Sequence, residues 1–127
     1  MNSLDQAMTK LWGCQIESYD FDLIGHKFDL TVRRSAGTHN EDFKVSVEGV
    51  VSFSWINGID ARRLQLSEWE YLDLATIDMT QDTKIKILGD KFVSQFSASP
   101  NLCVEIWDSI LLIEASVIKI NEQKFNI

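Results

Sequence analysis

Residues that mark covalent frameworks, metal centres or nucleophilic catalysis are scarce in this sequence. The 127 residues include two cysteines, two histidines and one proline. Cys14 and Cys103 lie far apart in apolar, alternating segments without a CxxC partner, which favours buried, reduced thiols over a disulfide scaffold or a reactive cysteine. A GxSxG nucleophile elbow and a glycine-rich phosphate loop are both missing. We therefore expect a non-enzymatic protein without catalytic, cofactor-binding or metal-binding residues.

The two histidines leave alternatives open. His39 is followed by an Asn-Glu-Asp run, so a metal-binding loop is conceivable, although the spacing fits no EF-hand or zinc pattern. A hydrolase would need His26 or His39 to meet a carboxylate and a nucleophile in a cleft. A solvated polar turn is the simpler interpretation, because each histidine lies in a predicted loop.

Basic residues are outnumbered in the chain. Twelve Lys and Arg stand against nineteen Asp and Glu, which gives a formal net charge of −7. The average field of such a chain repels a phosphate backbone and argues against nucleic-acid binding. An acidic surface instead attracts basic partners and raises their encounter rate. Solubility alone would also account for the acidic balance, since net charge bears on association and not on fold.

Long hydrophobic runs are lacking as well. Residues 1–6 have neither the basic region nor the apolar core of a signal peptide. The most apolar stretch, residues 106–118, is interrupted by Asp108, Ser109 and Glu114, whereas a membrane-spanning helix needs about 20 apolar residues. We therefore expect a cytoplasmic protein that does not bind membranes.

The dominant positive signal is the alternation of apolar and polar residues, which is typical of half-buried strands. Residues 3–12 are the exception, because Leu4, Met8 and Leu11 recur at helical spacing and Ser3 with Gln6 has the form of a capping box. Alternating segments separated by turn-forming residues cover 15–23, 27–34, 43–56 with a bend at Gly49, 83–88, 102–107 and 110–120. Residues 35–42 are predicted to form a loop.

Residues 59–80 fit two descriptions. Leu66, Trp69 and Leu72 could form a helical stripe, whereas the aromatic and β-branched residues from Trp69 onward favour a strand. We favour a loop to about residue 66 and a strand over 69–79. The whole pattern predicts one domain, residues 1–127, that is mainly β (borderline α+β). It would be an antiparallel curved sheet or sandwich of about seven or eight strands after one short N-terminal helix.

Four tryptophans are candidates for packing or binding. Trp55 and Trp107 each continue an apolar alternation, which predicts that they pack in the core. Trp69 differs because Glu68 and Glu70 flank it, an arrangement suited to an aromatic anchor within an acidic rim. Packing on the sheet is an equally good interpretation of Trp69.

Three segments carry a resemblance to a known family. They are Val-Glu-Gly-Val-Val-Ser-Phe-Ser-Trp at 47–55, Trp-Glu-Tyr-Leu-Asp-Leu at 69–74 and Val-Glu-Ile-Trp-Asp-Ser-Ile-Leu-Leu-Ile-Glu-Ala at 104–115. In these strand-like motifs the chain is similar to small bacterial proteins of the YxiG-like type, which are often placed among candidate immunity proteins of polymorphic toxin systems. The resemblance implies a cytoplasmic protein that binds and blocks a cognate toxin domain. It supplies no catalytic residues.

An immunity role would use the acidic charge, because toxin domains that cut nucleic acids tend to be basic. Carboxylates would then take the place of phosphates, and an aromatic side chain would anchor the contact. The expected partner-binding residues are Trp69 with Glu68, Glu70 and Asp73, and a second acidic group of Asp20 and Asp22. The alternative is a small-molecule-binding or self-associating β domain without a toxin partner. A homodimer would then form through an exposed edge such as residues 83–88.

Overall fold

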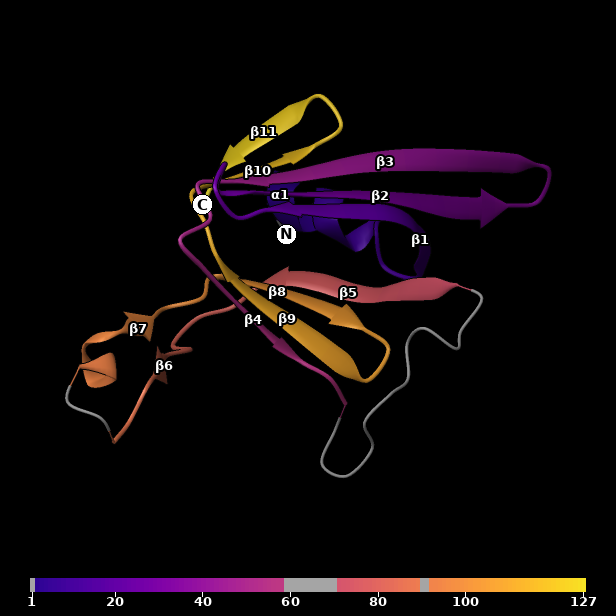
Figure 1. Cartoon of the computed structure of the whole chain (residues 1–127). Coiled ribbons are helices and arrows are strands. Elements are labelled where there is room, and N and C mark those ends of the chain that lie inside the picture. The colour runs from indigo at the N-terminus through magenta and orange to yellow at the C-terminus, as the bar shows by residue number, and fades with distance from the viewer. Residues whose placement is uncertain (1, 59–70, 90–91) are drawn as a thin grey trace.

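The computed structural model describes residues 2–58, 71–89 and 92–127, and these form one helix-capped assembly of antiparallel strands (Figure 1). Among these residues nine strands make one sheet in the order β11-β10-β3-β2-β1-β5-β8-β9-β4. Their bounds are β1 (Cys14–Asp22), β2 (Lys27–Ala36), β3 (His39–Glu48), β4 (Ser52–Ile56), β5 (Leu72–Met79), β8 (Leu102–Ile106), β9 (Ser109–Glu114), β10 (Val117–Ile120) and β11 (Gln123–Asn126). A separate pair, β6 (Ile85–Lys86) with β7 (Ser97–Ala98), brackets a 3₁₀ turn, η2 (Val93–Gln95).

The long sheet is bent into two layers that face each other. In Figure 1 the upper layer consists of β11, β10, β3, β2 and β1, and the lower layer consists of β5, β8, β9 and β4. The layers are joined where β1 pairs with β5 over three residue pairs, Cys14↔Leu74 to Ile16↔Leu72. This mainly β, antiparallel architecture with one short helix confirms the fold class expected from the alternation, although the strands outnumber the seven or eight expected.

A second connection between the layers is made by two bent strands. β3 passes into β4 through Gly49, whose φ is 67°, and β9 passes into β10 through Ser116. The two bends are held together by the Ser116 amide, which donates to the Glu48 carbonyl at 3.1 Å. The predicted bend at Gly49 is therefore confirmed, and it moves the chain from one layer to the other.

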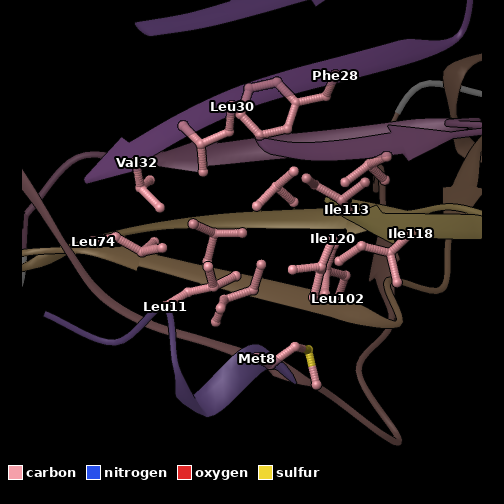
Figure 2. Close-up of a cluster of buried hydrophobic side chains, with 14 of the residues drawn as sticks. Met8, Leu11, Phe28, Leu30, Val32, Leu74, Leu102, Ile113, Ile118 and Ile120 are labelled. Atoms are coloured by element: carbon pink, nitrogen blue, oxygen red, sulfur yellow. The ribbon is translucent and has the colours of Figure 1, made fainter. Parts of the chain in front are cut away.

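The core lies between the layers and is built from the inward side chains of both (Figure 2). Upper-layer members include Leu30, Val32 and Val45, and lower-layer members include Leu74 and Ile113, all of them at most 3% exposed. Alternation with exposed polar neighbours places these residues on one face of each strand, as the sequence pattern predicts.

The N-terminal helix α1 (Ser3–Thr9) closes one side of the core. Met8 in the helix and Leu11 just beyond it are completely buried, and the Trp12 indole N–H donates to the Ile77 carbonyl at 3.0 Å. The helix begins at Ser3 as expected but ends at Thr9, before residue 12, and its N-cap lies one residue earlier than expected. Asn2 is the N-cap and forms the capping box with Asp5, so the expected Ser3–Gln6 pair is wrong, because the Asn2 side chain caps the first turn.

Two other local expectations need correction. The loop expected over 35–42 is instead a hairpin, because β2 and β3 pair as far as Ala36↔His39 and turn at Gly37. The strand expected over 83–88 is reduced to Ile85–Lys86. Of the ambiguous region, the strand is confirmed over Leu72–Met79, and residues 59–70 lie outside the described part of the chain.

Candidate binding surfaces

A β-bulge in β1 places aromatic side chains between the two layers. The register with β2 steps from Ile16↔Val32 to Ser18↔Thr31, which leaves Glu17 as the extra residue. Ile16 faces the core before the bulge, and Tyr19 and Phe21 line the space between the layers after it. If β1 paired regularly along its whole length, without the bulge, the period of two would instead turn Ser18 and Asp20 inward.

Those aromatics form one wall of an open, apolar cleft of about 420 Å³, which we call the aromatic cleft. Its lining comes from both layers and consists of Ile16, Tyr19, Phe21, Phe28, Leu30, Phe53, Trp55, Leu72, Ile106 and Leu111. The Phe21 ring packs against Phe53 with centroids 4.2 Å apart and against Phe28 at 4.9 Å. Part of the cleft lining is therefore a packed cluster of three aromatic rings.

The rim of the aromatic cleft is exposed. Tyr19 is 69% exposed, Phe53 is 42% exposed and Trp55 is 41% exposed. The expectation that Trp55 packs in the core is therefore wrong, because β4 is the last strand of the sheet and only β9 pairs with it among the described residues. Trp107 is also outside the core. It is half-buried in the turn between β8 and β9, where its ring meets Tyr71 edge-on at 6.2 Å.

The outer face of the lower layer is a second candidate surface, which we call the acidic face. It is formed by the outward side chains of β5, β8, β9 and β4, which alternate with the buried positions. A bulge at Ala75 lets both Asp73 and Asp78 point outward, since the register steps from Leu74↔Ile106 to Thr76↔Glu105.

Register aligns the acidic face into rows across the strands. One row runs Asp78, Cys103, Leu112 and Ser54, and the next runs Thr76, Glu105, Ile110 and Ile56. Along these two rows the acidic face changes from a carboxylate over β5 or β8 to apolar and hydroxyl side chains over β9 and β4, and Glu114 of β9 adds a carboxylate in the row of Ser52. The four described strands contain no Lys, Arg or His.

The negative charges of the acidic face act on one another. Burial raises the pKa of Asp78 above its ordinary value, and the neighbouring carboxylates Asp5 and Glu105 raise it further. The pKa of the Cys103 thiol is raised for the same kinds of reason, first by burial and then by Glu105 and Asp78. Cys103 is therefore held as the neutral thiol and is a poor nucleophile.

The expected contact residues are distributed over different parts of the molecule. Asp20 and Asp22 lie together on the outer face of the upper layer, where Asp20 is directly opposite Asp29. Asp22 also caps a turn, because its Oδ1 accepts from the Gly25 amide at 2.8 Å. Asp73 lies on the other layer, half-buried opposite Gln15 at the β1–β5 junction.

The outer face of the upper layer carries charges of both signs. Arg33 donates to Asp42 at 2.8 Å, and Lys119 donates to Glu48 at 3.0 Å. Asp20 and Asp22 are thus part of a mixed surface, unlike the acidic face. Trp69, Glu68 and Glu70 lie outside the described residues.

Sequence reasoning missed the acidic face and the aromatic cleft for the same reason. Asp73 and Asp78 are an odd number of residues apart, as are Ile16 and Tyr19, so strict alternation assigns each pair to opposite faces. One signal was available, namely the absence of basic residues over 97–118.

The histidines are far apart in the structure. His26 lies before β2 and its Nδ1 is 3.2 Å from the Val50 carbonyl oxygen, whereas His39 begins β3 at the opposite end of β2. The ten residues of β2 span about 30 Å. Within the described ranges no cluster of three or more His, Cys, Asp or Glu is placed to hold a metal ion, and no helix has the length and apolarity to cross a membrane.

These observations define a class: a small antiparallel β domain with an open aromatic cleft and an acidic sheet face. Comparison with protein families makes the assignment more specific. The model of the YxiG-like protein family matches residues 4–125, so the chain belongs to the YxiG-like family. A search of curated proteins found no match.

Proposed function

We propose that this protein is a non-enzymatic binding protein, and specifically an immunity protein that binds and neutralises a cognate, basic toxin domain. The observation that carries the proposal is the acidic face, whose described strands bear carboxylates and apolar side chains without a basic residue. The net charge of −7 supports the same kind of partner. The immunity role itself is the expectation drawn from the family resemblance.

The physical argument has two parts. A negative surface attracts a basic domain over a distance of several ångströms and raises the association rate, and it occupies the sites where that domain would hold phosphates. The apolar part, with Ile110, Leu112 and the exposed Ile56, provides area whose burial stabilises the complex once it forms. Protein interfaces usually combine an apolar centre with a polar border, and this face carries both kinds of side chain next to each other.

The test is growth rescue. The gene is co-expressed with the C-terminal domain of the large secreted protein encoded nearest to it. Rescue, together with a complex that co-purifies and weakens at high salt, is the expected result. An active toxin domain that still kills cells containing the folded protein would contradict the proposal.

Charge reversal locates the contact. Asp78→Lys with Glu105→Lys changes the charge of the acidic face by four units and is expected to weaken toxin binding at least tenfold. Asp20→Lys with Asp29→Lys makes the same change on the upper layer and is the matched control. If only the control pair weakens binding, the contact lies on β1 and β2, where Asp20 and Asp22 are located.

The aromatic cleft favours a second candidate, a small-molecule-binding domain. A volume of about 420 Å³ is within the range of ligand pockets, and its lining is almost entirely apolar. Native mass spectrometry of the protein purified from its own source organism would test this candidate. A stoichiometric bound molecule that is lost in Trp55→Ala would favour the ligand-binding function. A self-associating domain would instead appear as a dimer in sedimentation.

A further inference from the structure

We propose that the edge of β4 and the aromatic cleft bind an extended segment of the partner protein, which adds to the sheet as a further strand and inserts alternate apolar side chains into the cleft. The inference rests on the proposed function only in that it takes the partner to be a protein. Three features of the described residues carry it.

The first feature is a sheet edge that, within the described part of the chain, has none of the usual protection against pairing. β4 ends the nine-stranded sheet, and its sequence Ser-Phe-Ser-Trp-Ile contains no charge and no proline. Its register with β9 is continuous from Ser52↔Glu114 to Ile56↔Ile110, without a bulge. Charges, prolines and bulges are the usual means by which edge strands avoid pairing with another chain. The strand at the other end, β11, carries such a charge at Lys124.

The second feature is the set of backbone groups along this edge. In an antiparallel pair alternate residues direct their N–H and C=O groups away from the partner strand. Within the described part of the chain β4 pairs only with β9, so alternate residues of Ser52–Ile56 present donors and acceptors outward. An extended peptide satisfies such a row, and an apolar small molecule does not.

The third feature is the position of the aromatic cleft beside that edge. Phe53 and Trp55 are two residues apart, and both line the cleft from β4. A strand added to β4 has the same period and points every second side chain into the same space. The cleft of about 420 Å³ has room for a few separate apolar side chains.

The occupant is thus an extended segment with two or three large apolar residues at alternate positions. Between them we expect hydroxyl or basic residues. Those positions continue the acidic face beside Ser52 and Ser54, and the Glu114 carboxylate lies in the same row as Ser52. The absence of any basic side chain from these strands makes Lys and Arg the favourable charges.

The experiment uses a phage-displayed library of random linear dodecapeptides as the probe and the purified full chain as the target. Enriched peptides are expected to carry apolar residues at alternate positions and to bind, in fluorescence anisotropy, at least tenfold more weakly to Trp55→Ala. Phe96→Ala is the matched control, since Phe96 is an exposed aromatic outside the cleft, and it should leave affinity unchanged.

A second measurement does not depend on the folding of a variant. The best peptide is resynthesised with N-methyl groups on alternate amides, in both phases. Methylation in one phase removes the N–H groups that pair with β4, and this peptide should bind at least tenfold more weakly. Methylation in the other phase affects amides that point away from β4, and this peptide should retain its affinity. Equal affinity of both phases, or enriched peptides without apolar alternation, would overturn the proposal.

Amide hydrogen exchange in the toxin complex separates this inference from the proposed function. Protection of the β4 amides on binding supports the added strand. Growth rescue with unprotected β4 amides would overturn the inference and leave the immunity function standing. Failure of rescue together with phase-dependent peptide binding would contradict the immunity function and support the added strand. Concentration-dependent dimerisation that Ser54→Lys abolishes would assign the edge to a second copy of the chain instead.

Discussion

Asp78 shows how crowding of negative charge on the acidic face affects a single residue. It lies on the outer side of β5, where partial desolvation of its carboxyl group, followed by the charges of Asp5 and Glu105, raises its pKa. Its ionised form is therefore less favourable in the folded protein than in the unfolded chain.

The first prediction concerns Asp78→Asn. Because the folded-state pKa is raised, the destabilising effect of Asp78 is fully present above that pKa and disappears as the pH falls below the ordinary value of 3.8. The variant should therefore be more stable than the wild type at pH 7, by no more than about 0.5 kcal/mol, as is usual for surface substitutions. Urea denaturation at pH 7 and pH 3 measures the difference.

Asp42→Asn is the matched control of opposite sign. The hydrogen bond from Arg33 lowers the pKa of Asp42, so its stabilising effect is present above 3.8 and is lost as the pH falls through the folded-state pKa. Asp42→Asn should lower stability at pH 7 and converge with the wild type in acid. The same direction of change for both variants at pH 7 would show that their electrostatic environments do not differ as described.

At the scale of elements, the two bent strands determine how the layers meet. A Cβ added at Gly49 would lie 2.7 Å from the Ser116 Oγ and 2.9 Å from its Cβ, and these are the residues at which β3 and β9 change layer. Gly37, in the β2–β3 turn, has a similar φ of 64°, and a Cβ there meets nothing within 4 Å. Substitutions at Gly37 and Gly49 therefore distinguish the cost of backbone strain from the cost of steric contact.

Gly37→Ala should therefore lower the free energy of unfolding by about 1 kcal/mol, the cost of a side chain in left-handed backbone. Gly49→Ala adds an overpacked contact and should cost about 2–4 kcal/mol. Denaturant unfolding of both variants measures the two values. Equal costs would mean that the layers can move apart at the bend.

Helix α1 is the other element that decides whether the core is closed. Leu11→Ala removes a completely buried side chain and should cost about 2–5 kcal/mol. Leu4→Ala is the same truncation at a partly buried position of the helix and should cost clearly less. Calorimetric melting temperatures of the two variants provide the check. A small effect of Leu11→Ala would indicate that the core is complete without the helix.

At the scale of the whole molecule, charge is divided between two faces. On the outer face of the upper layer, charges of opposite sign form pairs, as in Arg33 with Asp42 and Lys119 with Glu48. In the strands of the lower layer, carboxylates are the only charged side chains. The negative charge of the protein is therefore unevenly distributed, and a basic partner is attracted to the acidic face.

A fourth prediction follows for the toxin complex. Raising the ionic strength from about 0.05 M to 0.5 M shortens the screening length several-fold, so the association rate constant should fall by roughly tenfold or more. The dissociation rate, which depends on close contacts, should change much less. Surface plasmon resonance across a salt series measures both. Dissociation that accelerates while association stays constant would contradict long-range steering.

The spacing of apolar residues was sufficient to predict the fold class, the N-terminal helix, the bend at Gly49 and several of the buried residues, because these depend on local period and on turn-forming residues. Leu30, Val32 and Val45 are examples whose burial follows from the pattern alone. The candidate sites were largely not predictable. Asp73 and Asp78 illustrate the difficulty, since only Asp73 was among the expected contacts although both lie on the acidic face.

The physical reason lies in the bulges and in the pairing order. One extra residue at Glu17 and one at Ala75 reverse the face of every residue that follows in the strand, and local sequence carries no signal for either. Which strand becomes the edge is decided by pairings between segments distant in the chain, such as β1 with β5. The tertiary structure therefore decided that Trp55 lines an exposed cleft, and that the acidic residues of β5 and β8 share a face.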